Sequence, residues 1–322
     1  MHPVRQIALI AFDGVQALDL TGPAGVFSAA NEAAGRPCYR VCILSPQGGA
    51  VTAGSGVRLL TDAIGNADPA GFDTILVAGG NKAGLSALVR DAGFAGWMAR
   101  ACAAARRYGS VCTGAFALAH LGLVSKQRVA THWEGTALLA RHYPDLQVDP
   151  DALYVEDGKV WTSAGVTTGI DMCMALVARD LGDAVANGVA RMLVVYARRP
   201  GYQSQFSPVL GAQSRATHGF TALLDWIGEH LHRPLDVALL ADCAGMSARS
   251  FHRKFTGATG QTPARFIETM RLDRARALLS TVGSLKEIAA RCGYATAGQM
   301  SKAFVRRYGM SPALFREMHG QA

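Results

Sequence analysis

A short apolar run turns directly into an alanine-rich helix at Gly109-Ser110-Val111-Cys112-Thr113-Gly114-Ala115-Phe116. Ser110–Cys112 predicts a short strand, and Gly114–Leu121 predicts a helix that Gly122 ends. A tight turn between a strand and a helix exposes the side chain at its corner, which here is Cys112. The turn also places this thiol near a helix N-terminus, whose positive dipole end favours the thiolate. We therefore take Cys112 as the first candidate site residue.

The first 195 residues alternate short β-type runs with helical stretches on both sides of this turn. Strands are expected at Val4–Phe12, Tyr39–Ser45, Thr74–Ala78, Leu153–Glu156 and Lys159–Ser163, the last two flanking the hairpin turn Asp157-Gly158. Helices are expected over Gly84–Tyr108, Thr168–Leu181 and Ala184–Tyr196, and from Thr21-Gly22-Pro23 onward with Thr21 near the cap. The alternation predicts an α/β three-layer sandwich of flavodoxin-like type around a mostly parallel sheet.

The sequence predicts two domains. Its 322 residues, of which 50% are hydrophobic, suit two domains better than one. The stretch Arg198–Pro208 has breakers and polar residues without periodicity, and no strand pattern follows it. We expect a first domain over 1–198, a linker over 199–217 and an all-α second domain over 218–322.

Composition excludes several classes of protein. No uncharged apolar run approaches about 18 residues, so we expect no membrane span. The seven cysteines form no CxxC pair and no Cys/His quartet, so we expect neither a disulfide framework nor a metal site, and no cofactor. The N-terminus lacks the marks of a signal peptide, and we expect a cytoplasmic protein.

The net charge of +8 is concentrated in the last third of the chain. Residues 1–200 carry 17 Lys and Arg against 16 Asp and Glu, whereas residues 218–322 carry 14 against 8. A basic domain beside a neutral one suggests a nucleic-acid partner for the basic part. Charge alone equally allows a basic surface that serves only solubility.

Residues 218–318 repeat one short plan twice. In each half a short apolar helix meets a glycine turn and continues into a helix with a basic, polar face. The two halves are Val237–Ser247 with Ala248–Phe255, and Leu285–Tyr294 with Thr296–Tyr308. This is the helix-turn-helix plan, in which glycine allows the tight turn and the second helix can enter a major groove. A helical bundle or a protein-interaction module are the alternatives.

Apolar residues at i, i+4 spacing would anchor the second helix of each half inward. These anchors are Phe251, Phe255, Met300, Phe304 and Tyr308. The polar residues between them are left facing outward, as candidates for base or phosphate contacts. They are Arg249, His252, Arg253, Gln299, Lys302 and Arg306.

This region resembles the AraC/XylS family of transcription regulators over about 100 residues. The resemblance rests on Ala289–Tyr294, the spaced Phe304 and the closing Tyr308–Pro312, with an echo of that ending at Thr259–Pro263. It implies two helix-turn-helix subdomains joined by a long helix, here over 264–279, and promoter DNA as partner. Members of the family are more often activators, which would make RNA polymerase a further partner.

Three more candidates lie near Cys112 in the expected first domain. Gly79-Gly80 follows a strand and could offer backbone N–H groups to an anion. Asp19 lies just before an expected helix, and His132 lies in Ala130–Trp133. Simpler interpretations exist: a buried, inert cysteine, an aspartate that only caps its helix, and a hydrogen-bonded core histidine.

Together these residues resemble the PfpI-like, class I glutamine amidotransferase-like superfamily over most of 5–195. The matching segments are Leu18–Pro23, Val77–Gly80, Val111–Gly114, Ala130–Trp133 and Thr162–Asp171. The resemblance implies Cys112 as the usual nucleophile, but Thr113 stands where PfpI-type peptidases carry histidine. The pattern is closer to the isocyanide hydratase branch, in which the cysteine attacks carbon and an aspartate handles the water or proton.

The two regions in one chain resemble the GlxA family of transcription regulators. That resemblance implies a dimer through the first domain and a small, nitrogen-containing effector, whose cationic group Asp19 could pair. The expected ligand site is Asp19, Gly79, Gly80, Cys112, Thr113 and His132.

We expect a regulator, not an enzyme, because turnover would destroy the signal. The alternative is an active cysteine hydrolase or hydratase with Cys112 as nucleophile and Asp19 as general acid/base. Redox sensing through Cys112 is a third interpretation.

Overall fold

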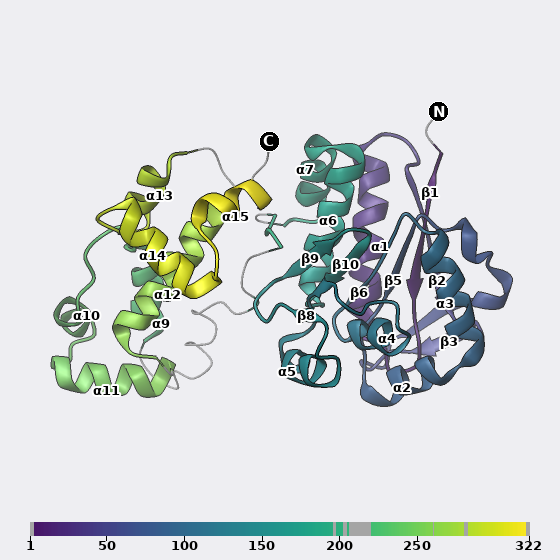
Figure 1. The fold of residues 1–322 in the computed structure, drawn as a ribbon, viewed down its shortest axis with the longest axis horizontal. Helices are drawn as coiled ribbons and strands as arrows, with labels where there is room; N and C mark the ends of the chain where they lie inside the picture. Colours follow the sequence, from purple (N-terminus) through teal and green to yellow (C-terminus); the bar gives the residue numbers. More distant parts are fainter. Residues whose placement is uncertain are drawn as a thin grey trace. The chain divides into compact units, whose positions relative to one another are not determined.

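The computed structural model describes residues 3–195, 198–201, 205, 220–259, 261–279 and 283–319. It divides into two compact units, Met1–Gln205 and Phe206–Ala322. Figure 1 shows the strands and helices of unit 1 and the helices of unit 2.

Unit 1 is built on an eight-stranded sheet with the order β3-β4-β2-β1-β5-β6-β10-β9. Its strands are β1 Arg5–Ile10, β2 Tyr39–Ser45, β3 Gly49–Thr52, β4 Arg58–Ala63, β5 Thr74–Val77, β6 Arg107–Val111, β9 Tyr154–Asp157 and β10 Val160–Ser163. A separate parallel pair joins β7 Arg128–Val129 to β8 Gln147–Val148. Only β3 with β4 and β9 with β10 pair antiparallel, which confirms the mostly parallel sheet and the hairpin at Asp157-Gly158.

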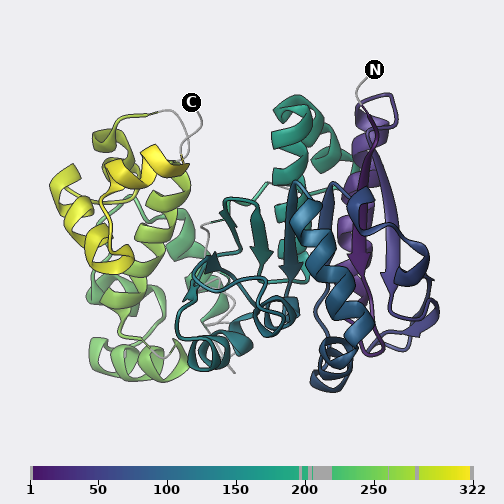
Figure 2. The same ribbon diagram turned by 45° about the vertical axis from the view of Figure 1, so that its right-hand side comes forward.

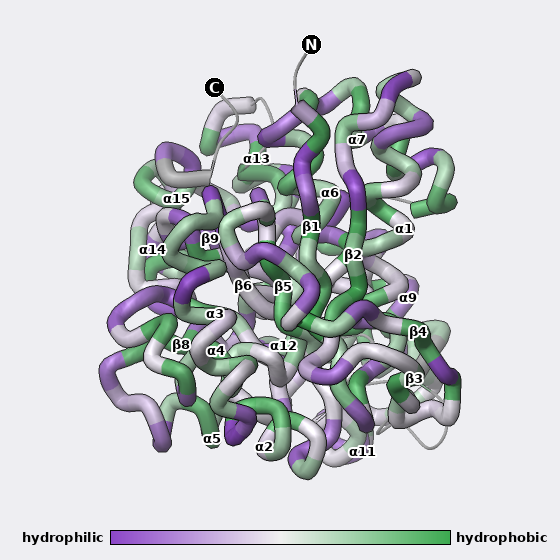
Figure 3. Tube along the Cα trace, turned by 90° about the vertical axis from the view of Figure 1, so that its right-hand side faces the viewer, coloured by the Kyte–Doolittle hydropathy of each residue, from purple (hydrophilic) through white to green (hydrophobic). Residues whose placement is uncertain are grey.

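The central strands are buried on both faces, as parallel strands covered by helices must be. Every residue of β5 and β6 is buried. Figure 3 shows the hydrophobic colour along the lower parts of β1 and β2 and hydrophilic residues at their upper ends. The apolar core therefore lies along the middle of the sheet.

Two helical layers cover this sheet. The helices are α1 Ala17–Ala33, α2 Lys82–Arg90, α3 Ala92–Ala104, α4 Gly114–His120, α5 Trp133–His142, α6 Thr167–Leu181 and α7 Asp183–Met192, with 3-10 turns at Ile64–Asn66 and Pro69–Gly71. The helices α1, α6 and α7 pack against one another in one layer. The helix α1 crosses from β1 to β2, and α3 crosses in the opposite direction from β5 to β6 (Figure 2). Because such crossovers are right-handed, α3 lies on the other face.

The strand order reverses between β1 and β5, because the chain leaves β1 for β2 on one side and returns to β5 on the other. Ligands of open α/β sheets bind beyond the carboxyl ends of the strands at such a point. Asp19 follows β1, Gly79-Gly80 follows β5 and Cys112 follows β6. The topology thus gathers these candidate residues at one edge of the sheet.

The predicted start of the first helix was wrong. The helix α1 begins at Ala17, so Thr21 lies inside it and its hydroxyl donates to the Ala17 carbonyl at 3.0 Å. The reason is a tertiary contact: the amide of Gln16 donates to the Gly79 carbonyl at 2.8 Å and ends the extended chain there.

The single helix expected over 84–108 was also wrong. Asp91 ends α2 with an extended backbone and caps α3, accepting a hydrogen bond from the Phe94 amide at 2.8 Å. Arg107 and Tyr108 then join β6, which pairs with β5 on one side and β10 on the other. Sheet pairing overrides local helix preference at these two residues.

The described residues of unit 2 form helices and no strand. Its helices are α9 Thr221–Glu229, α10 Val237–Cys243, α11 Ala248–Thr259, α12 Pro263–Leu279, α13 Leu285–Arg291, α14 Ala297–Tyr308 and α15 Pro312–His319. The pairs α10–α11 and α13–α14 are the two predicted helix-turn-helix subdomains, and α12 is the long helix between them. Gly245 and Gly293 take positive φ values of 62° and 74° in the two turns, which glycine adopts without strain.

The linker expected over 199–217 falls mostly outside the described residues. Four of its residues are described, and three of them, Arg199, Gly201 and Gln205, hydrogen-bond to other residues of unit 1. In the described part of the chain, no helix is long and apolar enough to span a membrane.

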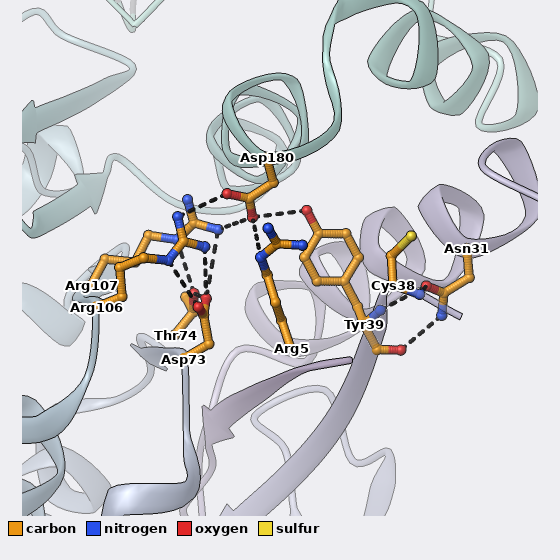
Figure 4. Close-up of polar contacts among 9 residues, drawn as sticks. All are labelled: Arg5, Asn31, Cys38, Tyr39, Asp73, Thr74, Arg106, Arg107 and Asp180. Atoms are coloured by element: carbon orange, nitrogen blue, oxygen red, sulfur yellow. Dashed lines mark hydrogen bonds and ion pairs between the residues drawn. The ribbon is translucent and has the colours of Figure 1, made fainter. Parts of the chain in front are cut away.

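An ion-pair cluster around Asp180 ties the amino ends of four strands to α6 (Figure 4). Asp180 accepts hydrogen bonds from Arg106 at 2.9 Å, from the Tyr39 hydroxyl at 2.9 Å and from Arg107. Arg5 lies 3.7 Å away. Burial alone would raise the pKa of Asp180, but the hydrogen bond from Arg106 and the charge of Arg107 lower it below its ordinary value. Stability from this cluster is therefore present at neutral pH and lost as the pH falls through that lowered pKa.

Asp180→Ala is expected to lower the free energy of unfolding by about 3 kcal/mol, because the buried Arg107 would lose its nearest carboxylate and keep only Asp73, 3.9 Å away. Asp183 is the matched control: it pairs with Arg198 but its side chain is 55% exposed, and Asp183→Ala should cost less than about 1 kcal/mol. Urea denaturation at neutral pH measures both. Equal losses would contradict a structural role for the Asp180 cluster.

Candidate functional site

Cys112 occupies the corner between β6 and α4 with a φ of +58°. This left-handed conformation is uncommon for a residue with a side chain and persists only where the surroundings impose it. A Cβ on Gly165 would lie 2.1 Å from the Cβ of Cys112, and one on Gly79 would lie 2.6 Å from it. Two glycines thus let the loops after β5 and β10 pack directly against the cysteine.

Backbone contacts hold the corner in place. The Cys112 amide donates to the Ser163 carbonyl at 2.9 Å, which extends the pairing of β6 with β10 by one residue. The Thr131 hydroxyl, wholly buried, donates to the Cys112 carbonyl at 3.0 Å. The cysteine side chain itself is nearly buried, with 8% of the residue exposed.

Asp19 projects from the first turn of α1 and is 1% exposed. Its two oxygens accept hydrogen bonds from the Gly79 amide at 3.0 Å and from the Val166 amide at 2.7 Å. Its carboxylate also hydrogen-bonds the Cys112 thiol. Asp19 therefore does not merely cap its helix: it links three separate segments at the cysteine.

The two side chains change each other's titration. Burial raises the pKa of Asp19 to about 6, although the amides of Val166 and Gly79 lower it. Burial and then the Asp19 charge raise the pKa of Cys112 to about 12. The expectation that the helix N-terminus favours the thiolate was wrong, because these two effects exceed it. At neutral pH the pair is a neutral thiol that donates to a carboxylate.

The other predicted ligand residues divide into two groups. The Thr113 hydroxyl lies 3.0 Å from the Gly80 amide and 3.1 Å from the Gly80 carbonyl. The amides of Gly79 and Gly80 are thus occupied by Asp19 and Thr113, so an anion would have to displace these partners. His132 lies at the start of α5, and its ring contacts Glu134 at 3.7 Å and Trp133. The structure brings five of the six residues together and directs the ring of His132 elsewhere.

Sequence reasoning missed Gly165 and Val166, which complete the site. Val166 has a φ of +52°, a strained value for a β-branched residue, and its amide reaches Asp19. The available signal was a glycine directly after a strand, within a segment that already matched the superfamily. Neither spacing nor composition reveals which amide in that loop faces the carboxylate.

The thiol–carboxylate pair can pass a proton between sulfur and oxygen. When the thiol attacks an electrophilic carbon, its proton can move to Asp19, whose raised pKa makes it a stronger base than an ordinary aspartate. The same carboxylate can instead attract a cationic ligand. Among the described residues, no group of three or more His, Cys, Asp or Glu side chains could hold a metal ion.

A second candidate site is formed by the outward faces of α11 and α14. Phe251, Phe255, Met300 and Phe304 are buried and face the core of unit 2, as predicted. All six predicted contact residues are exposed: Arg249, His252, Arg253, Gln299, Lys302 and Arg306. Lys254 and Arg307, which the sequence reasoning did not single out, are also exposed on these helices.

Arg306 differs from the other five because it forms an ion pair. Its guanidinium lies 2.5 Å from the carboxylate of Glu268 on α12. Its side chain is nevertheless 67% exposed, so the pair is open to water and weak. Arg306 would have to exchange Glu268 for a phosphate or a base in order to contact DNA.

The chain matches two family models. The DJ-1/PfpI family matches residues 5–179, and a helix-turn-helix domain matches residues 240–318. The chain is 29% identical to the HTH-type transcriptional regulator GbdR of Pseudomonas aeruginosa over 312 residues, which are 96% of this chain and 83% of GbdR.

Two further relatives represent the two kinds of function considered above. The HTH-type transcriptional regulator GlxA of Rhizobium meliloti is 29% identical over 296 residues, covering 91% of this chain and 89% of GlxA. The isonitrile hydratase of Pseudomonas putida is 32% identical over 200 residues, which are 62% of this chain and 82% of the hydratase. The regulators match both units, whereas the hydratase matches a smaller share of the chain.

Asp19→Asn is expected to raise the rate at which iodoacetamide alkylates Cys112 at pH 8 by about tenfold, since a neutral neighbour lowers the thiol pKa. In the unchanged protein the rate should still be rising at pH 10, because the thiol pKa is about 12. Peptide mass spectrometry at several pH values measures both rates. Glu134→Gln, which removes an exposed carboxylate on α5, is the control. A similar increase in that variant would argue against the Asp19–Cys112 pair.

Proposed function

The chain belongs to the DJ-1/PfpI family and ends in a helix-turn-helix domain, and on this premise we propose that it is a transcription regulator controlled by a small molecule. Its relatives over most of its length are HTH-type transcriptional regulators, GlxA among them, as the sequence resemblance predicted. Unit 2 would bind promoter DNA, and unit 1 would bind the effector.

The observation that carries the DNA-binding part is the pair of exposed basic helix faces. In each subdomain two large apolar residues of the second helix are buried, Phe251 and Phe255 on α11 and Met300 and Phe304 on α14, and the basic residues of these helices are exposed. Residues 218–322 carry 14 Lys and Arg against 8 Asp and Glu, so DNA attracts this part of the chain. Since the proposed partner is promoter DNA, we place the protein in the cytoplasm.

The effector site we propose is the Cys112 corner at the carboxyl edge of the sheet. The buried Asp19 carboxylate supports a small ligand with a cationic or N–H group, because such a group restores the charge balance that burial disturbs. A nitrogen-containing metabolite fits this chemistry. A homodimer through unit 1 would present four helix-turn-helix subdomains to a repeated operator, and contact with RNA polymerase would make the protein an activator.

One observation favours a second function, an isonitrile hydratase-like activity. The Cys112 thiol and the Asp19 carboxylate form a hydrogen-bonded pair, and the hydratase of Pseudomonas putida is 32% identical over 200 residues. In that reaction Cys112 would attack the isocyanide carbon and Asp19 would carry the proton. The regulator remains the first proposal because its relatives match both units.

A ligand screen on the full chain separates these two functions. Amino acids, quaternary amines, polyamines, amides and isocyanides are tested by thermal shift, and each mixture is then analysed by mass spectrometry. An effector at 100 times its dissociation constant should add about 2.7 kcal/mol to the free energy of unfolding. An unchanged ligand supports the sensor. Conversion of the ligand that is lost in Cys112→Ala would make the protein an enzyme and overturn the first proposal.

Arg253→Ala is expected to weaken DNA binding by about 1–3 kcal/mol, because it removes an exposed cation from the recognition face of α11. Titration of labelled DNA, selected from a random library and measured at two salt concentrations, gives the loss. A loss confined to one base position indicates a base contact, whereas a uniform loss with a salt slope reduced by about 1 indicates a phosphate contact.

Arg141→Ala is the matched control, because Arg141 is an exposed arginine on α5 of unit 1. It should leave the DNA affinity unchanged. If Arg253→Ala and Arg141→Ala behave alike, α11 is not a recognition helix.

A further inference from the structure

The segment by which the chain leaves unit 1 is attached to the loops that surround Cys112. Arg199, Gly201 and Gln205 are its three points of attachment. We call these three residues the exit latch. Its bonds to other described residues all lie within unit 1.

Arg199 makes the strongest attachment of the exit latch. Its guanidinium donates to the Asp171 carboxylate at 2.6 Å and 3.0 Å, and its amide donates to the same group at 3.2 Å. The Asp171 side chain is 3% exposed, so this carboxylate depends on Arg199 for its charge partner. Arg199 also donates to the Thr167 hydroxyl at 2.8 Å.

Thr167 connects the Arg199 attachment to the Cys112 site. It directly follows Val166, whose amide donates to Asp19 at 2.7 Å. Val166 holds a φ of +52°, so its conformation is kept by its contacts and relaxes if they are lost. A change at Asp19 therefore reaches Arg199 through two adjacent residues.

Gln205 provides a second, independent route. Its side-chain amide donates to the carbonyls of Thr131 at 3.0 Å and Ala152 at 3.1 Å. Thr131 in turn donates through its hydroxyl to the Cys112 carbonyl at 3.0 Å. The Gln205 Oε1 atom is buried with no hydrogen-bond partner among the described residues, which makes this attachment the easier one to release.

Gly201 completes the exit latch between these two residues. Its carbonyl accepts hydrogen bonds from the amides of Leu153 at 2.6 Å and Tyr154 at 3.2 Å. A Cβ at this position would lie 2.4 Å from the Tyr154 carbonyl oxygen, so the approach requires glycine. The three described points of attachment thus bind the first turns of α6, the start of β9 and the chain segments around Thr131 and Ala152.

We propose that the exit latch couples the Cys112 site to unit 2: occupation of the site changes how firmly Arg199 and Gln205 hold the segment that leads to the DNA-binding unit. This inference rests on the proposed regulator function and names the residues through which it would act. Coupling of this kind is reciprocal, so a change at the exit latch must also alter the reactivity of Cys112.

The test uses the full chain and iodoacetamide as the probe, because it fills the site by forming a bond to Cys112. DNA affinity and hydrogen exchange over residues 198–205 are measured before and after alkylation. A Cys112→Ala protein treated in parallel corrects for the other thiols, including the exposed Cys243. In the unchanged protein, alkylation should shift both quantities by about fivefold or more, a coupling of the usual size.

Two variants weaken the connection between the Cys112 site and Arg199, and one matched variant leaves it intact. Thr167→Val removes the bond between Arg199 and an exposed hydroxyl, so the fold is kept, and Arg199→Gln removes all the guanidinium bonds to Asp171 and Thr167. Both should reduce the effect of alkylation to the part that passes through Gln205 and Thr131. Arg198→Gln is the control, because Arg198 pairs with Asp183 and Asn187 on α7 and has no bond to the Cys112 loops. It should respond as the unchanged protein does.

The outcomes separate this inference from the function on which it rests. If the unchanged protein binds no DNA, the proposed function fails, and hydrogen exchange alone decides on the exit latch. If DNA binds but alkylation alters neither DNA affinity nor exchange, the exit latch does not couple the site. If Thr167→Val and Arg199→Gln keep the full response, coupling takes another route and the inference is wrong.

Discussion

The buried carboxylate of Asp19 is the interaction on which unit 1 depends at its carboxyl edge. It accepts amide hydrogen bonds from Gly79 and Val166 and one from the Cys112 thiol, so four segments meet at two oxygen atoms. These hydrogen bonds offset part of the cost of burying the charge, which still raises the pKa of Asp19 to about 6. The close packing that this requires is possible because Gly79 and Gly165 have no Cβ.

The same carboxylate sets the chemistry of the site. Its charge and the burial around it keep Cys112 protonated at neutral pH, in contrast to the thiolate that helix position alone favours. A thiol that stays protonated at neutral pH reacts slowly with electrophiles, which suits a sensor. A thiol that loses its proton only on attack also suits a hydratase, since Asp19 is placed to receive that proton. The geometry at Cys112 is therefore compatible with both functions. The helix-turn-helix subdomains of unit 2 are what favour transcription regulation.

Much of the fold follows from local pattern. The continuous apolar runs predict buried parallel strands, and the repeated helix–glycine–helix plan predicts both subdomains of unit 2, since a glycine at positive φ is required in each turn. The errors lie where long-range contacts override local preference. Gln16 pairs with the Gly79 carbonyl and moves the start of α1, and sheet pairing draws Arg107 and Tyr108 out of a helix-like stretch.

The sequence by itself determined the class of both units, the corner cysteine and the exposed basic helix faces. Each of these features follows from residue types at short, regular spacing along the chain. Only the tertiary structure decided which groups surround Cys112. Gly165 and Val166 lie more than 50 residues after Cys112, the His132 ring contacts Glu134, and Arg199 and Gln205 bind residues far from them in sequence. Hydrogen bonds and burial between distant segments also set the pKa values of Asp19 and Cys112, and no local pattern encodes them.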